Sequence, residues 1–315
     1  MDIANKVLIC DQIDNIGIEI LKKNGFDVEY QPDISREELL KNVNLFDIIV
    51  VRSRTKIDKE IIENAKRAKI IARVGVGLDN IDLLSANDKN IEVINAPEAA
   101  MNSVSELVIG LMLSLARNIP TADREMKLGN WIKKELMGTE LNGKYLGIIG
   151  VGNIGRNLSR IAKGLRMNII GYDSFPIKKE FINEVGMITT DLKTLVQSSD
   201  FISCHIPFTP ETRHLFNEDL FSQMKPSAFF INTSRGEIVD ENALYNALVN
   251  KKIAGAGLDV FEIEPPFDKL FVQLPNVICT PHIGAQTKEA QKLASSVIAE
   301  KIIIKIREKE RTSNI

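Results

Sequence analysis

The sequence has little cysteine and almost no excess charge of either sign. Its three cysteines, Cys10, Cys204 and Cys279, are scattered over 315 residues. Neither a disulfide framework nor a paired-cysteine zinc site is therefore expected, and we predict no metal site. The formal net charge of -2 provides no electrostatic surface for nucleic acid or for an anionic membrane. Any acidic ligand must be met by positive charges that are placed locally.

Long hydrophobic runs are also absent. The first apolar stretch, Val7 to Cys10, lacks the basic flank and the length of a signal peptide. No later stretch reaches the roughly 20 apolar residues that a membrane-spanning helix requires. Together with the few scattered cysteines, which fit a reducing compartment, these absences predict a cytoplasmic protein.

What the chain has is the composition of an ordinary soluble globular protein, with 44% hydrophobic and 26% charged residues. A length of 315 residues exceeds the usual size of a single domain, which favours two domains and a cleft between them.

Short runs rich in β-branched residues alternate with longer helical patterns along the whole chain. This alternation is typical of βαβ units, so the predicted fold class is α/β with mostly parallel sheets. The second series of strands, after Tyr145, matches a doubly wound nucleotide-binding sheet. The predicted strands are 6–10, 47–51, 70–73, 92–94, 146–149, 168–172, 201–204, 228–232, 255–260 and 277–280.

Two helix starts show the spacing of a capping box, one at Ser35 and Glu38 and the other at Ser103 and Glu106. The second helix, predicted to run to about Arg117, leaves little polar face. It must therefore be buried in a core or against another subunit, and the sequence leaves both alternatives open. A last helix, predicted over 288–307, has to pack outside the second sheet.

A glycine-rich loop follows the strand predicted at 146–149. Gly150, Gly152 and Gly155 permit a tight turn and close backbone approach, and the helix that follows offers free N–H groups to a pyrophosphate. Asp173 ends the next strand, 18 residues beyond Gly155 (173 minus 155). A carboxylate there accepts bonds from the ribose hydroxyls and repels the extra phosphate of NADP, so the predicted cofactor is NAD.

Three further side chains follow strands of the same series. Arg235 is placed to hold a substrate carboxylate with two hydrogen bonds. His282 has an ordinary pKa suited to proton transfer at neutral pH, and Glu264 would fix its tautomer and raise its pKa. Taken alone, Arg235 could be a surface charge, Glu264 a turn residue and His282 a structural histidine. Together the three residues predict the oxidation of an alcohol. His205 and His214 are weaker candidates for the base.

These segments, 232–236, 258–266 and 280–285, together with the glycine loop, resemble the D-2-hydroxyacid dehydrogenase family over essentially the whole chain. The matching arginine, glutamate and histidine are catalytic in that family. The resemblance implies two Rossmann-like domains, with a discontinuous substrate domain at 1–97 and 286–315 and an NAD domain at 98–285. It also implies a homodimer with the apolar helix after Asn102 in its interface.

Within the family, segments 51–56, 72–80 and 137–141 resemble the phosphoglycerate dehydrogenases. A phosphorylated substrate needs more cations than Arg235, and Arg52 and Arg73 would supply them. By resemblance Ser53, Gly75 and Asn102 would also contact the substrate, and Lys133 or Lys134 would reach a phosphate in the partner subunit, although a surface charge is the alternative for both lysines. The resemblance also assigns cofactor contacts to Val76, Asn153, Ile154, His205, Ile206, Pro207, Thr233, Ser234, Asp259, His282 and Ala285.

Two departures from that pattern are visible. Some phosphoglycerate dehydrogenases have threonine where this chain has Val76, so a cofactor contact there has to come from the backbone. The sequence stops at Ile315 without the regulatory domains of longer members, so serine feedback through such a domain is not expected.

The predicted reaction is NAD-dependent oxidation of 3-phosphoglycerate, the first step of serine synthesis. The alternatives are a glyoxylate or hydroxypyruvate reductase and, from another class, an NAD-sensing corepressor.

Overall fold

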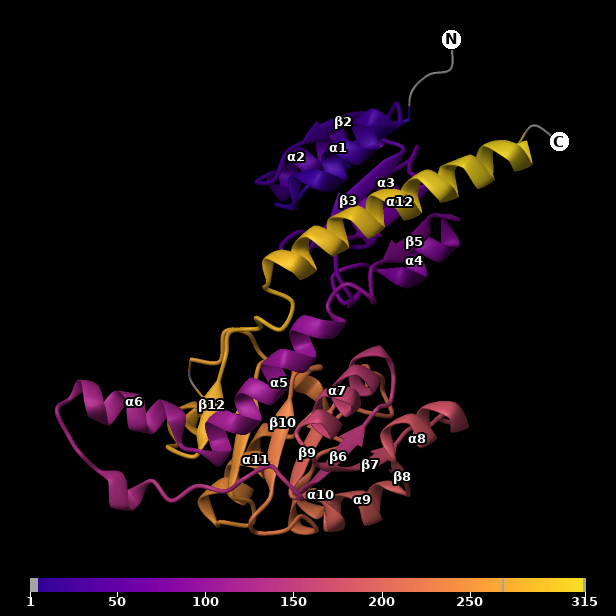
Figure 1. Cartoon of the computed structure of the whole chain (residues 1–315). Helices are drawn as coiled ribbons and strands as arrows, with labels where there is room; N and C mark the ends of the chain where they lie inside the picture. The colour runs from indigo at the N-terminus through magenta and orange to yellow at the C-terminus, as the bar shows by residue number, and fades with distance from the viewer. Residues whose placement is uncertain (1–4, 268, 314–315) are drawn as a thin grey trace. The chain divides into compact units, whose positions relative to one another are not determined.

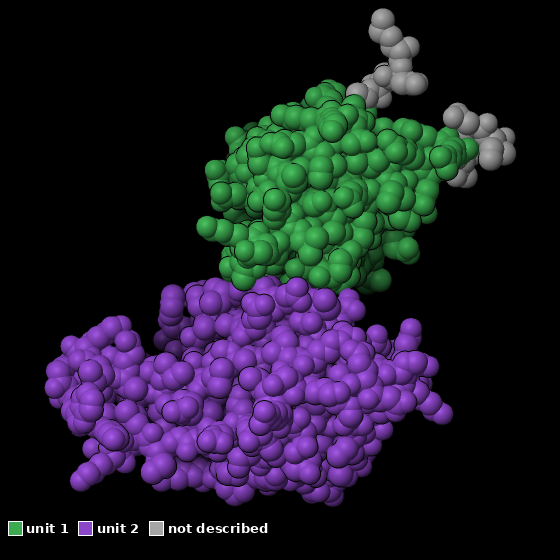
Figure 2. Space-filling view, in the orientation of Figure 1, with its two compact units in different colours: residues 1–100, 285–315 green, residues 101–284 purple. Residues whose placement is uncertain are grey.

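The computed structural model describes residues 5–267 and 269–313, which divide into two compact units. Unit 1 comprises Met1–Ala100 and Ala285–Ile315, and unit 2 is the continuous segment Met101–Gly284 (Figure 2). The divisions after residues 100 and 284 differ from the predicted ones by three residues and one residue. Both units are α/β with fully parallel sheets, as the alternation of strand and helix patterns predicts.

Unit 1 has five strands in the order β2-β1-β3-β4-β5. Strand β2 was not predicted, because three of its four residues are exposed and it lies at the sheet edge. The capping box at Ser35 and Glu38 is present and begins α2. The bounds are β1 Lys6–Ile9, α1 Asn15–Lys23, β2 Asp27–Tyr30, α2 Arg36–Asn42, β3 Ile48–Val51, α3 Lys59–Asn64, β4 Ile70–Arg73, α4 Leu83–Asp88, β5 Glu92–Asn95 and α12 Lys288–Ser313.

The last helix, α12, belongs to unit 1, although it follows unit 2 in the sequence (Figure 1). Its buried residues Ile298 and Ile302 join the same core cluster as Ile18 and Leu21 of α1. Gly17 allows α1 to approach α12 closely, since a Cβ there would lie 2.4 Å from Oγ of Ser295. The core of unit 1 therefore depends on residues from both ends of the chain.

Unit 2 has seven strands in the order β12-β11-β10-β9-β6-β7-β8. The two-residue strand β8 at its edge is exposed and was not predicted. The bounds are α5 Met101–Ala116, α6 Ile119–Lys127, β6 Tyr145–Ile149, α7 Asn153–Gly164, β7 Asn168–Tyr172, α8 Lys179–Val185, β8 Ile188–Thr189, α9 Leu192–Ser198, β9 Phe201–Cys204, α10 Glu218–Ser222, β10 Phe229–Asn232, α11 Glu241–Val249, β11 Gly255–Leu258 and β12 Val277–Cys279.

Helix α5 corrects one prediction. It begins at Met101, so Ser103 lies inside the first turn and is buried rather than capping the helix. The capping box predicted from Ser103 and Glu106 is therefore wrong, because the turn at 97–100 leads straight into the helix. Val108, Met112 and other residues of its apolar face are buried in the core of unit 2.

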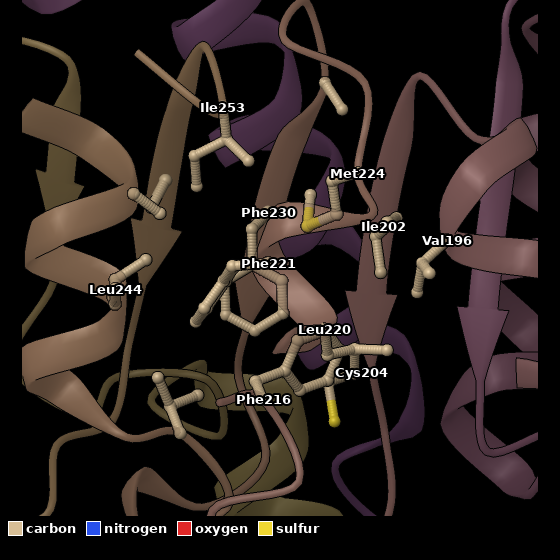
Figure 3. Close-up of a cluster of buried hydrophobic side chains, with 14 of the residues drawn as sticks. Val196, Ile202, Cys204, Phe216, Leu220, Phe221, Met224, Phe230, Leu244 and Ile253 are labelled. Atoms are coloured by element: carbon tan, nitrogen blue, oxygen red, sulfur yellow. The ribbon is translucent and has the colours of Figure 1, made fainter. Parts of the chain in front are cut away.

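A second core cluster packs against the face of the unit 2 sheet opposite to α5. Phe216, Phe221 and Phe230 meet there, with ring centroids 4.4 to 5.7 Å apart (Figure 3). Full burial of such a side chain stabilises a fold by about 1.5–3 kcal/mol. Both faces of this sheet are covered, and in sheets of this kind ligands bind at the carboxyl ends of the strands.

No helix in the described part of the chain is both long and apolar enough to cross a bilayer.

Candidate active site

The glycine loop follows β6 and leads into α7. Gly150 adopts a left-handed conformation with φ of 90°, and a Cβ there would lie 2.7 Å from the carbonyl oxygen of His205. A Cβ on Gly155 would lie 2.2 Å from the carbonyl oxygen of Gly150. Gly152 is the N-cap of α7 and provides no side-chain cap, so the helix start offers its N–H groups to an anion.

Asp173, just after β7, connects to this loop directly. Its Oδ2 accepts from the backbone N–H of Val151 at 2.7 Å, and its Oδ1 accepts from that of Phe175 at 2.9 Å. The carboxylate is only partly buried and has further lone pairs, so it remains able to accept bonds from ribose hydroxyls.

Two buried polar atoms without a hydrogen-bond partner follow neighbouring strands. They are Nδ1 of His205 after β9 and Oγ1 of Thr233 after β10, and the residues before them, Cys204 and Asn232, are paired in the sheet. Burial lowers the pKa of His205 to about 4, so its ring is neutral at pH 7 and is a poor proton acceptor. Orphan polar groups beside a glycine cradle are what a bound dinucleotide would satisfy, so these residues fit NAD.

The remaining predicted cofactor residues of unit 2 lie near the same strand ends. Ser234 donates from its N–H and its Oγ to Oδ1 of buried Asn232. The Ile154 carbonyl accepts from Ser105 and the Pro207 carbonyl from Thr212, which fixes both backbones. Asn153 begins α7, and Ile206 packs against the core.

His282 and Glu264 form the hydrogen-bonded pair that the sequence predicts. Nδ1 of His282 lies 2.9 Å from Oε2 and 3.1 Å from Oε1 of Glu264, which leaves Nε2 for a reacting group. The bond to Glu264 raises the pKa of His282 above its ordinary value despite partial burial. Burial works against ionisation of Glu264, but the hydrogen bond from His282 holds the pKa of that carboxyl below its usual range. The pair is therefore arranged to accept and hold a proton.

Asp259 holds the loop that carries His282. It is 1% exposed, and its Oδ1 accepts from Thr280 Oγ1 at 2.6 Å and from the N–H of Ile283 at 2.8 Å. Its Oδ2 accepts from the N–H of Gly284 at 2.8 Å. These bonds position His282, whose backbone is left-handed with φ of 51°; the cofactor contact predicted for Asp259 stays a prediction.

Arg235 lies close enough to influence both members of the pair. The hydrogen bond to Glu264 raises the pKa of His282, and the positive charge of Arg235 offsets part of this rise; the same charge also helps to lower the pKa of Glu264. The carbonyl of Arg235 accepts from the side chain of Asn232 at 2.8 Å. Gly236 follows directly, and a Cβ there would lie 1.9 Å from the carbonyl carbon of Phe261. The backbone after Arg235 is thus packed tightly on the segment leading to Glu264.

A second histidine–carboxylate pair, His214 with Glu262, was not predicted from the sequence. Nε2 of His214 bonds to Oε1 of Glu262, and the N–H of Glu262 donates to Oε1 of buried Glu241 at 2.9 Å. These bonds fasten the segment 261–264 that leads to Glu264.

Unit 1 brings Arg52 and Arg73 together at the ends of the neighbouring strands β3 and β4. Nε of Arg73 donates to the carbonyl of Arg52 at 3.2 Å, and the Arg52 guanidinium donates to Oε1 of Gln286 at 2.8 Å. Gly75 provides room for this arrangement, since a Cβ there would lie 2.7 Å from Nη1 of Arg73. Ser53 is exposed beside Arg52.

The other residues predicted to contact the cofactor or the substrate show no arrangement specific to a ligand. The carbonyl of Val76 accepts from Asn95, Asn102 accepts from Asn157 at 3.1 Å, and Ala285 accepts through its carbonyl from Gln291. Lys133 and Lys134 lie exposed on a short 3-10 helix. Within residues 5–267 and 269–313, no three histidine, cysteine or acidic side chains are grouped to hold a metal ion.

Comparison with known proteins extends these observations. Residues 109–284 match the family model described as D-isomer specific 2-hydroxyacid dehydrogenase, NAD binding domain. The chain is 47% identical to D-3-phosphoglycerate dehydrogenase from Methanocaldococcus jannaschii over 94% of its own length, but it spans only 56% of that relative.

Hydroxypyruvate reductase from Thermotoga maritima is 45% identical, with 94% of this chain and 97% of the relative covered. The structure of D-lactate dehydrogenase from Aquifex aeolicus with NAD and lactic acid superimposes with a TM-score of 0.83 at 29% identity, covering 98% and 97% of the two chains.

Proposed function

The chain belongs to the D-isomer specific 2-hydroxyacid dehydrogenase family, and from this premise we propose that it oxidises 3-phosphoglycerate to 3-phosphohydroxypyruvate with NAD, the first step of serine synthesis. The resemblance to phosphoglycerate dehydrogenases supports this substrate. The observation that carries the proposal is the pair Arg52 and Arg73, whose adjacent positions at two strand ends suit a phosphate dianion.

In the proposed reaction, His282 accepts the proton of the substrate 2-hydroxyl through Nε2. Glu264 receives the Nδ1–H, fixes the tautomer and stabilises the imidazolium that forms. In the reverse direction the same imidazolium returns the proton to the carbonyl oxygen.

Arg235 is proposed to hold the substrate carboxylate with two parallel hydrogen bonds. Bound NAD supplies the hydride acceptor; the residues that would hold it are the glycine loop, Asp173, Thr233 and His205. The negative charge of Asp173 opposes the extra phosphate of NADP.

The substrate assignment is tested by replacing Arg52 and Arg73 together by alanine. Each charge-assisted hydrogen bond contributes about 1.5–3 kcal/mol, so kcat/KM for 3-phosphoglycerate should fall by about 10²- to 10⁴-fold. Reduction of hydroxypyruvate, which has no phosphate, should be spared. The matched control is Arg67→Ala, which removes another cation of unit 1 that pairs with Asp47. Equal loss for both substrates, or no loss, refutes the assignment.

A glyoxylate or hydroxypyruvate reductase is the second candidate. It is favoured by the Thermotoga maritima relative, which this chain covers almost completely. A panel of 2-hydroxy and 2-keto acids, assayed by NADH absorbance with wild-type protein, separates the two candidates by their kcat/KM values.

An NAD-sensing corepressor is the alternative from another class. Loss of turnover in His282→Ala with NAD binding retained would support an enzyme, whereas binding of NAD without oxidation of any hydroxy acid would support a sensor.

We also propose that the protein is a cytoplasmic homodimer. After α5, the segment containing α6 extends from the sheet of unit 2 (Figure 1) and exposes Trp131 and Met137 by 78% and 88%. Large exposed apolar side chains favour burial against another subunit. Sedimentation of Trp131→Arg should show a shift toward monomer.

A further inference from the structure

A buried carboxylate lies at the carboxyl end of β1, next to the turn that carries Arg52. Asp11 is 3% exposed. Its Oδ2 accepts from the backbone N–H of Arg52 at 2.5 Å and of Thr55 at 3.2 Å, and its Oδ1 accepts from Oγ1 of Thr55 at 2.6 Å. One side chain just after β1 thus holds both ends of the turn 52–55 that follows β3.

Arg54 is bound to the same carboxylate. Its Nε lies 3.2 Å from Oδ1 of Asp11, and its Nη2 donates to the carbonyls of Cys10 at 2.5 Å and Pro32 at 2.8 Å. Its Nη1 donates to the carbonyl of Ile34 at 3.2 Å. These bonds occupy the guanidinium of Arg54 with the scaffold, so its role here is structural.

The carbonyl side of Arg52 is fixed as well. Its oxygen accepts from Nε of Arg73 at 3.2 Å and from Nδ2 of Asn80 at 3.0 Å, and Asn80 also donates to the carbonyl of Thr55 at 2.7 Å. Both polar groups of the Arg52 backbone are therefore held by residues from other elements. A side chain on a backbone so constrained binds its ligand with less loss of conformational entropy.

The charges in this network are also informative. It joins three arginines, Arg52, Arg54 and Arg73, to one carboxylate, Asp11. Positive charges outnumber negative ones among these four residues. A phosphate monoester carries about -1.5 to -2 at pH 7, which is more negative charge than a single carboxylate carries, so it matches this excess better.

We propose that Asp11 is the positioning residue of an anion-binding turn, residues 52–55, whose ligand is the phosphate group of a phosphorylated 2-hydroxy acid. This inference rests on the proposed function for the identity of the substrate. It adds that discrimination between phosphorylated and unphosphorylated substrates depends on a carboxylate that does not itself touch the phosphate.

The chain offers a matched control at the amino end of β3. Asp47 is 5% exposed, accepts from the N–H of Lys6 at 3.0 Å, and pairs with Arg67 at 2.9 Å. It is nearly as buried as Asp11 and also combines hydrogen bonds with an arginine ion pair, but it lies at the opposite end of the same parallel strands. Asp47→Asn reports the structural cost of losing a buried carboxylate in unit 1.

The experiment compares Asp11→Asn with Asp47→Asn. An asparagine at position 11 retains one acceptor oxygen and directs its amide toward other donors, which loosens the turn. We expect the KM for 3-phosphoglycerate to rise at least tenfold in Asp11→Asn, with kcat and the KM for hydroxypyruvate changed less than threefold. In Asp47→Asn all these values should stay within threefold of wild type. Equal effects on both substrates, or the same split in Asp47→Asn, overturn the proposal.

Thr55 provides a milder test if Asp11→Asn does not fold. Thr55→Val removes only the hydroxyl bonded to Asp11, and the KM for 3-phosphoglycerate should rise two- to fivefold. Thr55→Ser, which keeps the hydroxyl, should restore the wild-type value. An unchanged KM in Thr55→Val, or failure of serine to restore it, counts against the proposal.

Inorganic phosphate separates this inference from the proposed function. If wild-type protein does not oxidise 3-phosphoglycerate, the proposed function fails, but the turn is still tested by phosphate in thermal unfolding. Phosphate should raise the Tm of wild type and of Asp47→Asn and leave that of Asp11→Asn, or of Thr55→Val if Asp11→Asn does not fold, nearly unchanged. No rise in wild type, or an equal rise in these proteins, overturns the role of Asp11.

Discussion

Gly236 is tightly packed beside the proposed catalytic residues, and Gly236→Ala tests how closely Arg235 and Glu264 must be held. A Cβ at this position would lie 1.9 Å from the carbonyl carbon of Phe261, 2.2 Å from its oxygen and 2.3 Å from the nitrogen of Glu262. These are backbone atoms, so no side chain can rotate away. To reach an ordinary separation of 3.4 Å from that carbon, the segment must move by 1.5 Å (3.4 minus 1.9).

Such a movement is large relative to the bonds that hold the site. The contact between Glu264 and His282 is 2.9 Å, and the bond from Glu262 to Glu241 is also 2.9 Å. A misplacement of about 1 Å in a catalytic group can reduce the rate by about 10²-fold. We therefore expect kcat/KM to fall by about 10²-fold, and the free energy of unfolding to fall by about 1–3 kcal/mol because the site is overpacked.

The assay is NADH absorbance under subsaturating substrate, with Tm and NAD affinity measured on the same preparation. The control is Gly164→Ala, because a Cβ at Gly164 meets nothing within 4 Å. It should retain full activity. If Gly236→Ala keeps activity within threefold of wild type while folded, the argument that close backbone packing sets the distance from Arg235 to Glu264 is refuted.

Three further predictions concern the groups around His282. Because Glu264 raises the pKa of His282, Glu264→Gln should lower that pKa. In plots of kcat/KM against pH, the acidic limb for oxidation and the alkaline limb for reduction should then both move to lower pH. If neither limb moves, Glu264 does not tune the pKa of the base. His282→Asn should lose about 10²- to 10⁴-fold in kcat with NAD binding retained, measured by turnover and cofactor fluorescence; residual activity near wild type would exclude His282 as the base. Asp259→Asn should cost about 1–3 kcal/mol in unfolding free energy, read from denaturant melts; an unchanged midpoint would contradict its role in holding the loop.

The sequence predicts the fold well where burial dictates the pattern. Central strands such as β3 and β9 are fully buried on both faces and appear as uninterrupted apolar runs. Edge strands β2 and β8 were missed because exposure removes that pattern. The capping box at Ser103 was wrong for a related reason: a Ser-x-x-Glu spacing is local and does not show that the preceding turn already continues into the helix.

The candidate site was predictable as far as residues follow strands in sequence. Arg235, Glu264 and His282 each come after a strand end, and parallel strands bring such positions to one edge. Asp11 was not found, because a single aspartate after a strand is an ordinary turn residue until its partners are known. Those partners lie 41 to 44 residues away, a separation that neither periodicity nor motif spacing reveals.

The return of α12 to unit 1 has a consequence for synthesis of the protein. Unit 2 is one unbroken segment, 101–284, so all its strands have been made before the ribosome reaches α12. Unit 1 cannot close its core until Ile298 and Ile302 are available to Ile18 and Leu21. Throughout translation of unit 2, the first hundred residues therefore expose the apolar surface that α12 covers in the finished protein. We expect nascent chains stalled before residue 290 to bind chaperones through the first unit while the second is already resistant to protease.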